Sequence, residues 1–142
     1  MLNAISLYRV SRWLYLHHIP VLPKLITLLI FLIYNSKVPY QAEIGAGTKL
    51  GYGGIGVVIH ADSVIGSNCI ISQQVTMGGG NSKYPGVPII GDNVDISKGA
   101  IVFGGITIGN NVTIGANAVV NKPVPDNAIV AGVPAKILRF KQ

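Results

Sequence analysis

Glycine and acidic side chains are both missing from the first 42 residues of this 142-residue chain. All 18 glycines lie between Gly45 and Gly132, and the first of the five acidic residues is Glu43. Four cations and six aromatic residues precede that point, so residues 1–42 carry +4 of the net charge of +6. The chain therefore divides into a basic, apolar N-terminal arm (residues 1–42) and a glycine-rich body (residues 43–142).

Cysteine and long apolar runs are also scarce. The one cysteine, Cys69, cannot form a disulfide within the chain, so nothing in the sequence requires an oxidising compartment. The apolar run at residues 25–34 is too short to span a bilayer. Two prolines and a lysine at residues 20–24 make a poor signal peptide. We expect a cytoplasmic protein.

The arm predicts two helices, at residues 3–17 and from Pro23 to about Tyr34. The second is apolar on every side, so it has to be covered by an oligomer, a partner protein or the interface of a bilayer. Cations interleaved with leucine, tryptophan and tyrosine fit an anionic membrane surface better than nucleic acid. We expect peripheral contact with the inner face of the cytoplasmic membrane through residues 1–40, and no nucleic-acid partner.

Aliphatic residues recur at every sixth position of the body, which is the pattern of an internal repeat. Most of the residues two positions earlier are small or apolar, and glycine often follows the aliphatic residue. The two main runs are Ile59, Ile65, Ile71 and Met77, and then Ile90, Ile96, Val102, Ile108, Ile114 and Val120.

A period of six matches neither an α-helix nor a simple alternating strand. It predicts a parallel β-helix of about five stacked coils, in which each hexapeptide forms one of three flat faces. The aliphatic residues fill the interior, and glycine or asparagine takes the tight corners where a positive φ is needed. The columns place Ile59, Met77, Val102 and Val120 on one face.

The body resembles the hexapeptide-repeat acyltransferases, whose fold is a left-handed parallel β-helix. The segments VIGSNCIISQQVTMGGG, IIGDNVDISKGAIVFGGITIGNNVTIGANAVV and AGVPAKIL carry the resemblance, which covers about residues 43–138. The likeness is greatest to the serine acetyltransferase-like branch associated with polysaccharide biosynthesis. It implies a mainly β fold, acetyl-CoA as co-substrate and a homotrimer.

His60 is the only histidine of the body, and it follows an inward aliphatic residue at a predicted corner. Two interruptions of the repeat, at residues 52–57 and 79–87, are expected to converge on it, with His60 stacked over Gly78. An imidazole there could take the proton from an acceptor group, so His60 is the candidate general base. Asp62 is the first candidate for the carboxylate that orients it, and Glu43 and Asp92, from other coils or subunits, are weaker candidates.

The family implies further site residues. Its serine acetyltransferases carry an Asp-His pair where an ungapped alignment places Tyr52 and Gly53, seven residues before His60, and a second histidine where Tyr84 stands. Tyr52 and Tyr84 are therefore assigned to acceptor binding, and a carbohydrate hydroxyl is expected in place of serine. The CoA contacts implied by the family are Gly78, Ser97, Lys98, Ala116, Lys122, Ala131 and Lys136.

The sequence-based hypothesis is an acetyl-CoA-dependent O-acetyltransferase that acts directly on the hydroxyl of a polysaccharide or a lipid-linked sugar. One alternative is a serine O-acetyltransferase of cysteine biosynthesis, and another is a non-catalytic β-helix scaffold anchored to a membrane by the arm. Cys69 is expected in the core. No metal site is expected, because carbonic anhydrases of this fold use three histidines and the body has one.

Overall fold

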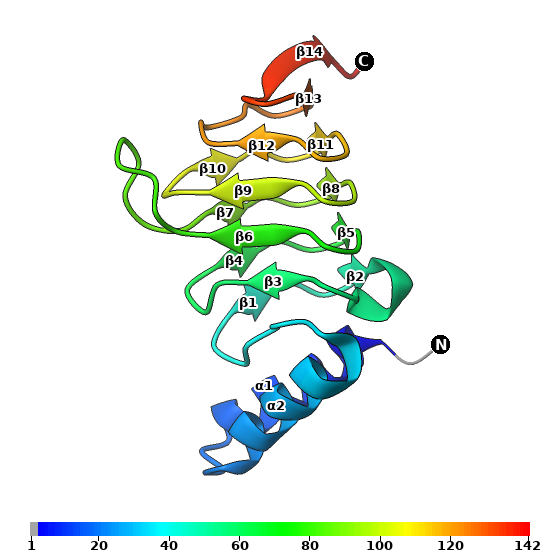
Figure 1. Cartoon of the computed structure of the whole chain (residues 1–142), viewed down its shortest axis with the longest axis vertical. Coiled ribbons are helices and arrows are strands. Elements are labelled where there is room, and N and C mark those ends of the chain that lie inside the picture. Colours follow the sequence, from blue (N-terminus) through cyan, green and yellow to red (C-terminus); the bar gives the residue numbers. More distant parts are fainter. Residues whose placement is uncertain (1–2) are drawn as a thin grey trace.

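The computed structural model describes residues 3–142, and most of them form a parallel β-solenoid with two helices packed below its first coil (Figure 1). The mainly β class and the helical arm are as predicted. The three sheets consist of β1 (Glu43–Ile44), β4 (Val64–Ile65), β7 (Ile89–Ile90) and β10 (Thr107–Ile108); of β3 (Val58–Ile59), β6 (Thr76–Gly78), β9 (Ile101–Phe103) and β12 (Val119–Val120); and of β2 (Lys49–Leu50), β5 (Ile70–Ile71), β8 (Asp95–Ile96), β11 (Thr113–Ile114), β13 (Ala128–Ala131) and β14 (Lys136–Phe140).

Each complete coil contributes one strand to each sheet, so β1 to β12 make four coils, fewer than the five expected. Within these coils all pairing is parallel and in register. Ile59 pairs with Met77, Met77 with Val102, and Val102 with Val120, which confirms the predicted face. These four side chains are almost fully buried, because the inward residue of each strand packs on its equivalents in the coils above and below.

Two different constraints explain the small residues at the corners. Asn68, Asn93 and Asn111 sit in the left-handed conformation, with φ of 58°, 56° and 59°, as predicted for asparagine at a corner. Glycines that follow the inward residue are there for another reason. A Cβ on Gly66 would lie 2.6 Å from the carbonyl carbon of Gly91 in the next coil, so stacking leaves no room for a side chain.

The helices α1 (Ala4–Leu16) and α2 (Leu22–Tyr34) close the open end of the first coil. Arg9 donates hydrogen bonds to the carbonyls of Ile44 and Gly45, and Arg12 donates to those of Tyr40 and Gln41. Tyr8 is also buried there, and burial raises the pKa of its phenol. The helices therefore satisfy backbone acceptors that have no further coil to bind them.

This role changes the interpretation of the arm's charge. Two of its four cations are bound to carbonyl groups, which leaves Lys24 and Lys37 exposed. Most apolar side chains of α2 remain exposed and form an apolar surface, because only Pro23, Ile30 and Tyr34 of that helix are buried. Within residues 3–142, neither helix has the length and hydrophobicity needed to cross a membrane.

The other end of the solenoid is closed differently, by a strand that the period of six does not predict. The strand β14 turns back and pairs antiparallel with β13, which places it at the far end of the molecule from the helices (Figure 1). Lys136 and Ala131 face each other in this pair.

Replacing Gly66 with alanine should destabilise the fold, because the added methyl group would overlap the next coil. We expect a loss of about 1–3 kcal/mol in the free energy of unfolding, measured by denaturant titration. Gly78→Ala is the matched control, since nothing lies within 4 Å of the position of its Cβ. Equal stability of the two variants would contradict this account of the glycines.

Candidate active site

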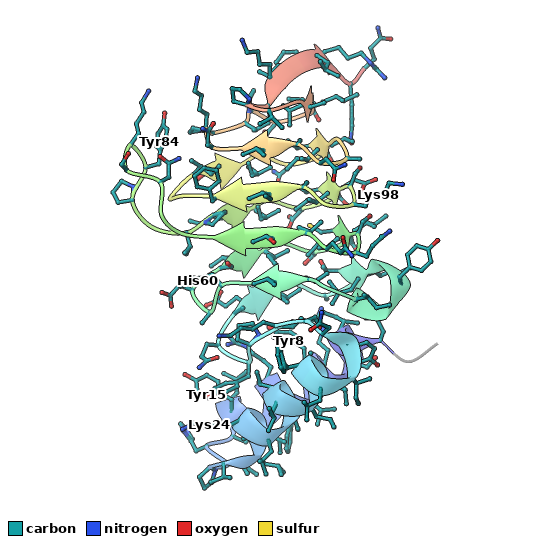
Figure 2. All side chains as sticks on the ribbon, viewed as in Figure 1. Tyr8, Tyr15, Lys24, His60, Tyr84 and Lys98 are labelled. Atoms are coloured by element: carbon teal, nitrogen blue, oxygen red, sulfur yellow. The ribbon has the colours of Figure 1, made fainter. Side chains whose placement is uncertain are left out.

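His60 lies at the corner between β3 and β4, where its exposed imidazole points away from the solenoid (Figure 2). Its backbone is held firmly, because its N–H donates to the carbonyl of Met77 at 3.0 Å and its own carbonyl accepts from Ser63 at 3.0 Å. The predicted stacking beside Gly78 follows from this register. The fold therefore presents an imidazole at a fixed point of the surface.

A groove of about 270 Å³ opens beside this imidazole. The residues that line it include His60, Val58, Thr76 and Gly78. Because Gly78 has no side chain and no neighbour within 4 Å of its Cβ position, the groove stays open next to the imidazole. A small acceptor and the end of a thioester arm would both fit near His60.

The Asp62 carboxylate makes no hydrogen bond to the imidazole of His60 in this structure, although the sequence hypothesis expects it to orient the ring. Its carboxylate Oδ2 is 4.0 Å from His60 Nδ1, beyond hydrogen-bond distance. The backbone N–H of Asp62 donates to Nδ1 instead, at 3.1 Å. In a neutral ring this contact places the proton on Nε2, whereas a base that acts through Nε2 needs its proton on Nδ1.

The two interruptions of the repeat do not converge on His60. The first forms a short 3-10 helix at Gly51–Gly54, at the opposite end of β3, and a Cβ on Gly54 would lie 3.0 Å from Ala4 in α1. It therefore packs against the helical cap. Tyr52, in this segment, is exposed and is not brought together with His60 within the chain.

The second interruption leaves the solenoid next to His60, as predicted, but then folds toward the C-terminal coils (Figure 1). Asn81 donates to the carbonyl of Asn121 at 2.8 Å, and the carbonyl of Tyr84 accepts from Gly105 at 2.7 Å. Tyr84 is half-buried against the later coils.

The residues assigned to CoA fall on two different corners. Gly78 and Lys122 lie on the corner of His60, whereas Ser97, Lys98 and Ala116 lie on the corner that follows the six-stranded sheet. Figure 2 shows His60 and Lys98 on opposite sides of the solenoid. Ala131 and Lys136 lie in the terminal strand pair. One chain alone does not bring these residues together.

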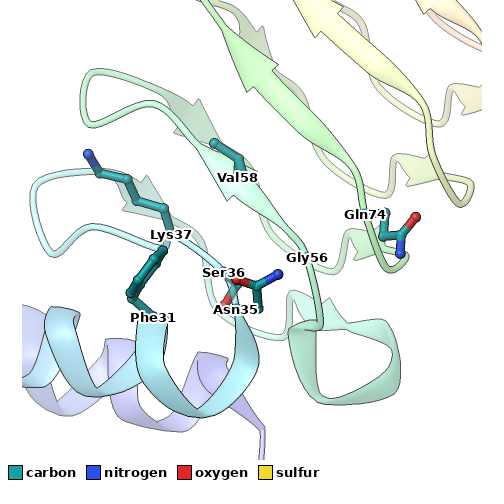
Figure 3. Close-up of a pocket in the computed structure, with 7 residues that line it drawn as sticks. All are labelled: Phe31, Asn35, Ser36, Lys37, Gly56, Val58 and Gln74. Atoms are coloured by element: carbon teal, nitrogen blue, oxygen red, sulfur yellow. The ribbon is translucent and has the colours of Figure 1, made fainter.

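Lys37 is a residue of the groove that the sequence did not single out. It precedes the first repeat, but a parallel bridge to Val58 places it beside β3. A second groove, of about 550 Å³, shares Lys37 and Val58 with the first and extends toward Phe31 and Gln74 (Figure 3). The chemistry is assigned to the smaller groove because it contains the imidazole.

Cys69 is buried in the core, as expected from its position in the repeat. Burial raises the pKa of its thiol, so the reactive thiolate is disfavoured. Within residues 3–142, no three histidine, cysteine, aspartate or glutamate side chains gather as metal ligands.

Comparison with known proteins finds close relatives. No family model matches the chain. A serine acetyltransferase of Synechococcus elongatus is 38% identical over 137 residues, which is 96% of this chain and 56% of the relative. A serine acetyltransferase of Staphylococcus xylosus is 38% identical over 138 residues, 96% of this chain and 63% of the relative. The chain thus spans about half to two thirds of the length of these relatives.

Solved structures agree with the sequence comparison. A serine acetyltransferase from Vibrio cholerae superposes with a TM-score of 0.88 at 34% identity, covering 98% of this chain and 54% of that one. A serine acetyltransferase from Brucella abortus in complex with coenzyme A superposes with a TM-score of 0.89 at 33% identity, covering 98% and 56%. The left-handed β-helix of hexapeptide repeats expected from the sequence is confirmed.

The same comparisons correct the expected acceptor. These relatives and solved structures are serine acetyltransferases, so the hypothesis of a carbohydrate O-acetyltransferase is wrong, and the polysaccharide-biosynthesis branch is not supported. Taken alone, the departures from the serine acetyltransferase pattern at Tyr52–Gly53 and at Tyr84 favour a sugar acceptor. Similarity over nearly the whole chain outweighs two positions, and it supports the serine alternative.

Proposed function

We propose that this chain transfers an acetyl group from acetyl-CoA to the hydroxyl of L-serine, as a member of the hexapeptide-repeat, left-handed β-helix acyltransferases whose fold it shares. The observation that carries the proposal is the similarity to serine acetyltransferases over 96% of the chain. A groove with a single imidazole is consistent with direct transfer, which needs one base and no covalent enzyme intermediate.

His60 is proposed as the general base. Its Nε2 takes the proton of the serine hydroxyl as the hydroxyl oxygen attacks the thioester carbonyl. The C–S bond then breaks, and the thiolate of CoA receives the proton from the imidazolium. For Nε2 to accept, the proton of the neutral ring must sit on Nδ1. The Asp62 carboxylate lies 4.0 Å from Nδ1, so a small movement of either side chain would provide the acceptor that holds this tautomer.

The distribution of the CoA residues supports a homotrimer. In a three-fold ring, each protomer contacts one neighbour through one surface and the other neighbour through a different surface. The corner that carries His60 and Gly78 would then face the corner of a neighbour that carries Ser97, Lys98 and Ala116. Acetyl-CoA would lie between the two, with Lys122 and Lys136 available to its phosphates.

Peripheral membrane contact through the arm is a separate proposal, and what supports it is the open apolar surface of α2. Leu28 and Leu32 are 52% and 68% exposed on this surface. The electrostatic support is smaller than the charge of the arm implies, because Arg9 and Arg12 bind carbonyl groups. Any binding should therefore depend on hydrophobic contact more than on anionic lipid.

Replacing His60 with alanine should lower the turnover of L-serine by about 10²–10⁴ while leaving thermal unfolding unchanged, because the side chain is exposed and acts only as the base. Release of CoA thiol reports the rate. Asp62→Asn should give a smaller loss, and His17→Ala, an exposed histidine of the arm, should give none. Near-normal turnover in the His60 variant would eliminate the assignment.

A mixture of two variants, each expected to lack activity on its own, tests the shared site. If His60→Ala and Lys98→Glu chains are co-expressed and mix at random in trimers, about one site in four joins an intact His60 to a neighbour's intact Lys98. We expect about a quarter of the wild-type turnover. A mixture no more active than either parent would contradict a site built by two protomers.

Flotation with lipid vesicles tests the arm. The protein should float with vesicles both with and without anionic lipid, and a Leu28→Glu, Leu32→Glu double variant should remain at the bottom of the gradient. Both leucines are exposed, so the change should not disturb the fold. Wild-type protein that stays at the bottom with both kinds of vesicle would exclude membrane contact.

A further inference from the structure

Lys37 places a positive charge beside the groove that contains His60, and the proposed reaction assigns no role to this charge. Among residues 3–142, His60 and Lys37 are the ionisable residues that line this groove. It also lines a neighbouring hollow of about 360 Å³ together with Lys24 and Phe31. Lys37 and Lys24 therefore border one side of the groove, whereas the carboxylates Glu43 and Asp62 line a separate hollow that meets the groove at Ala61.

The backbone of Lys37 is fixed as an additional partner of β3. Its N–H donates to the carbonyl of Val57 at 2.8 Å, and its carbonyl accepts from the N–H of Ile59 at 2.9 Å. Val38 is fully buried, so the alternation of an extended chain directs the Lys37 side chain outward, on the same face as Val58. Residue 37 is therefore positioned as firmly as a residue of the solenoid.

The side chain of Lys37 is directed toward the catalytic corner. In Figure 3 it extends away from Gly56 and Gln74, in the direction in which β3 runs. The strand β3 ends at Ile59, directly before His60. Lys37 and His60 therefore line one groove, and the Lys37 side chain extends toward the end of β3 that His60 follows.

Within residues 3–142, Lys37 forms no ion pair. The one contact between oppositely ionisable groups there is that of His60 with Asp62. An exposed ammonium that points along a concave surface without a carboxylate partner attracts anions to that surface. A ligand carboxylate would receive a charge-assisted hydrogen bond from it.

We infer that Lys37 binds the carboxylate of the acceptor while His60 receives the proton of its hydroxyl. The inference rests on the proposed function, and it adds the chemical class of the acceptor: a small hydroxy acid, held by its carboxylate. L-Serine has this chemistry, with the carboxylate and the hydroxyl on adjacent carbons. Lys37 is then a specificity-determining residue, and the imidazole performs the chemistry.

Replacing Lys37 with methionine keeps the length of the side chain and removes the charge. The KM for L-serine should rise about tenfold or more, the loss expected for one charge-assisted hydrogen bond, whereas kcat should change by less than about threefold. Lys37→Arg should retain most of the affinity. Lys49→Met, on an exposed lysine of β2 outside the groove, is the matched control and should behave as wild type. An unchanged KM in the Lys37→Met protein would overturn the inference.

Three acceptors separate this inference from the proposed function. L-Serine has a carboxylate and an ammonium group, glycerate has the carboxylate without the ammonium group, and serinamide has no carboxylate. Wild-type protein that acetylates glycerate but not L-serine, with loss of affinity in Lys37→Met, would refute serine as the acceptor and support Lys37. Equal use of serinamide and L-serine, with no effect of Lys37→Met, would refute Lys37 and leave the serine reaction standing.

If no acceptor is acetylated, a binding measurement tests whether Lys37 binds a carboxylate. Glycerate should shift the amide resonances of Thr76 and Gly78 in the wild-type NMR spectrum, because both residues line the groove. The shifts should weaken in Lys37→Met and persist in Lys49→Met. Their absence in the wild type, or equal shifts in the wild type and Lys37→Met, would overturn the carboxylate role of Lys37.

Discussion

Hydrogen bonding between neighbouring coils is the constraint on which the rest of this structure depends. Strands of two or three residues hold no structure alone, and each pairs only with the strands above and below it. The first and last coils would therefore expose unpaired backbone groups and invite pairing with other chains. Side chains of α1 bind those groups at one end, through Arg9 and Arg12, and β14 pairs with β13 at the other.

The same constraint decides where chemistry is possible. Inward positions are filled by aliphatic side chains that pack from coil to coil, so functional groups have to lie outside, at the corners. Two corners hold asparagine, glutamine or glycine in the left-handed conformation, for example Asn68 and Asn117. At the third corner His60 has an ordinary φ, and the residues with positive φ in the coils stacked on it are the glycines Gly80 and Gly104. This corner carries both the imidazole and the long loop. Lys37 lies beside it because the chain leaving α2 pairs with β3 before the first repeat begins.

The period of six is enough to predict the solenoid, the column from Ile59 to Val120 and the proximity of His60 to Gly78, because each depends only on register. It could not show where Tyr52 lies, since that segment packs against α1 through Gly54 and Ala4. Lys37 lies before the repeat, and the distance from His60 to Asp62 depends on side-chain rotamers that spacing does not fix. Single positions such as Tyr52 and Tyr84 do not identify the acceptor, because the similarity to serine acetyltransferases extends over 96% of the chain.

A crystal structure of the protein with CoA and L-serine bound tests the central claim most directly. The account predicts that the serine hydroxyl lies about 3 Å from Nε2 of His60, with the CoA sulfur in the same groove. It also predicts that the serine carboxylate lies against Lys37 and that a neighbouring protomer closes the site. A CoA sulfur bound at the corner of Lys98, with His60 open to solvent and distant from both ligands, would contradict it.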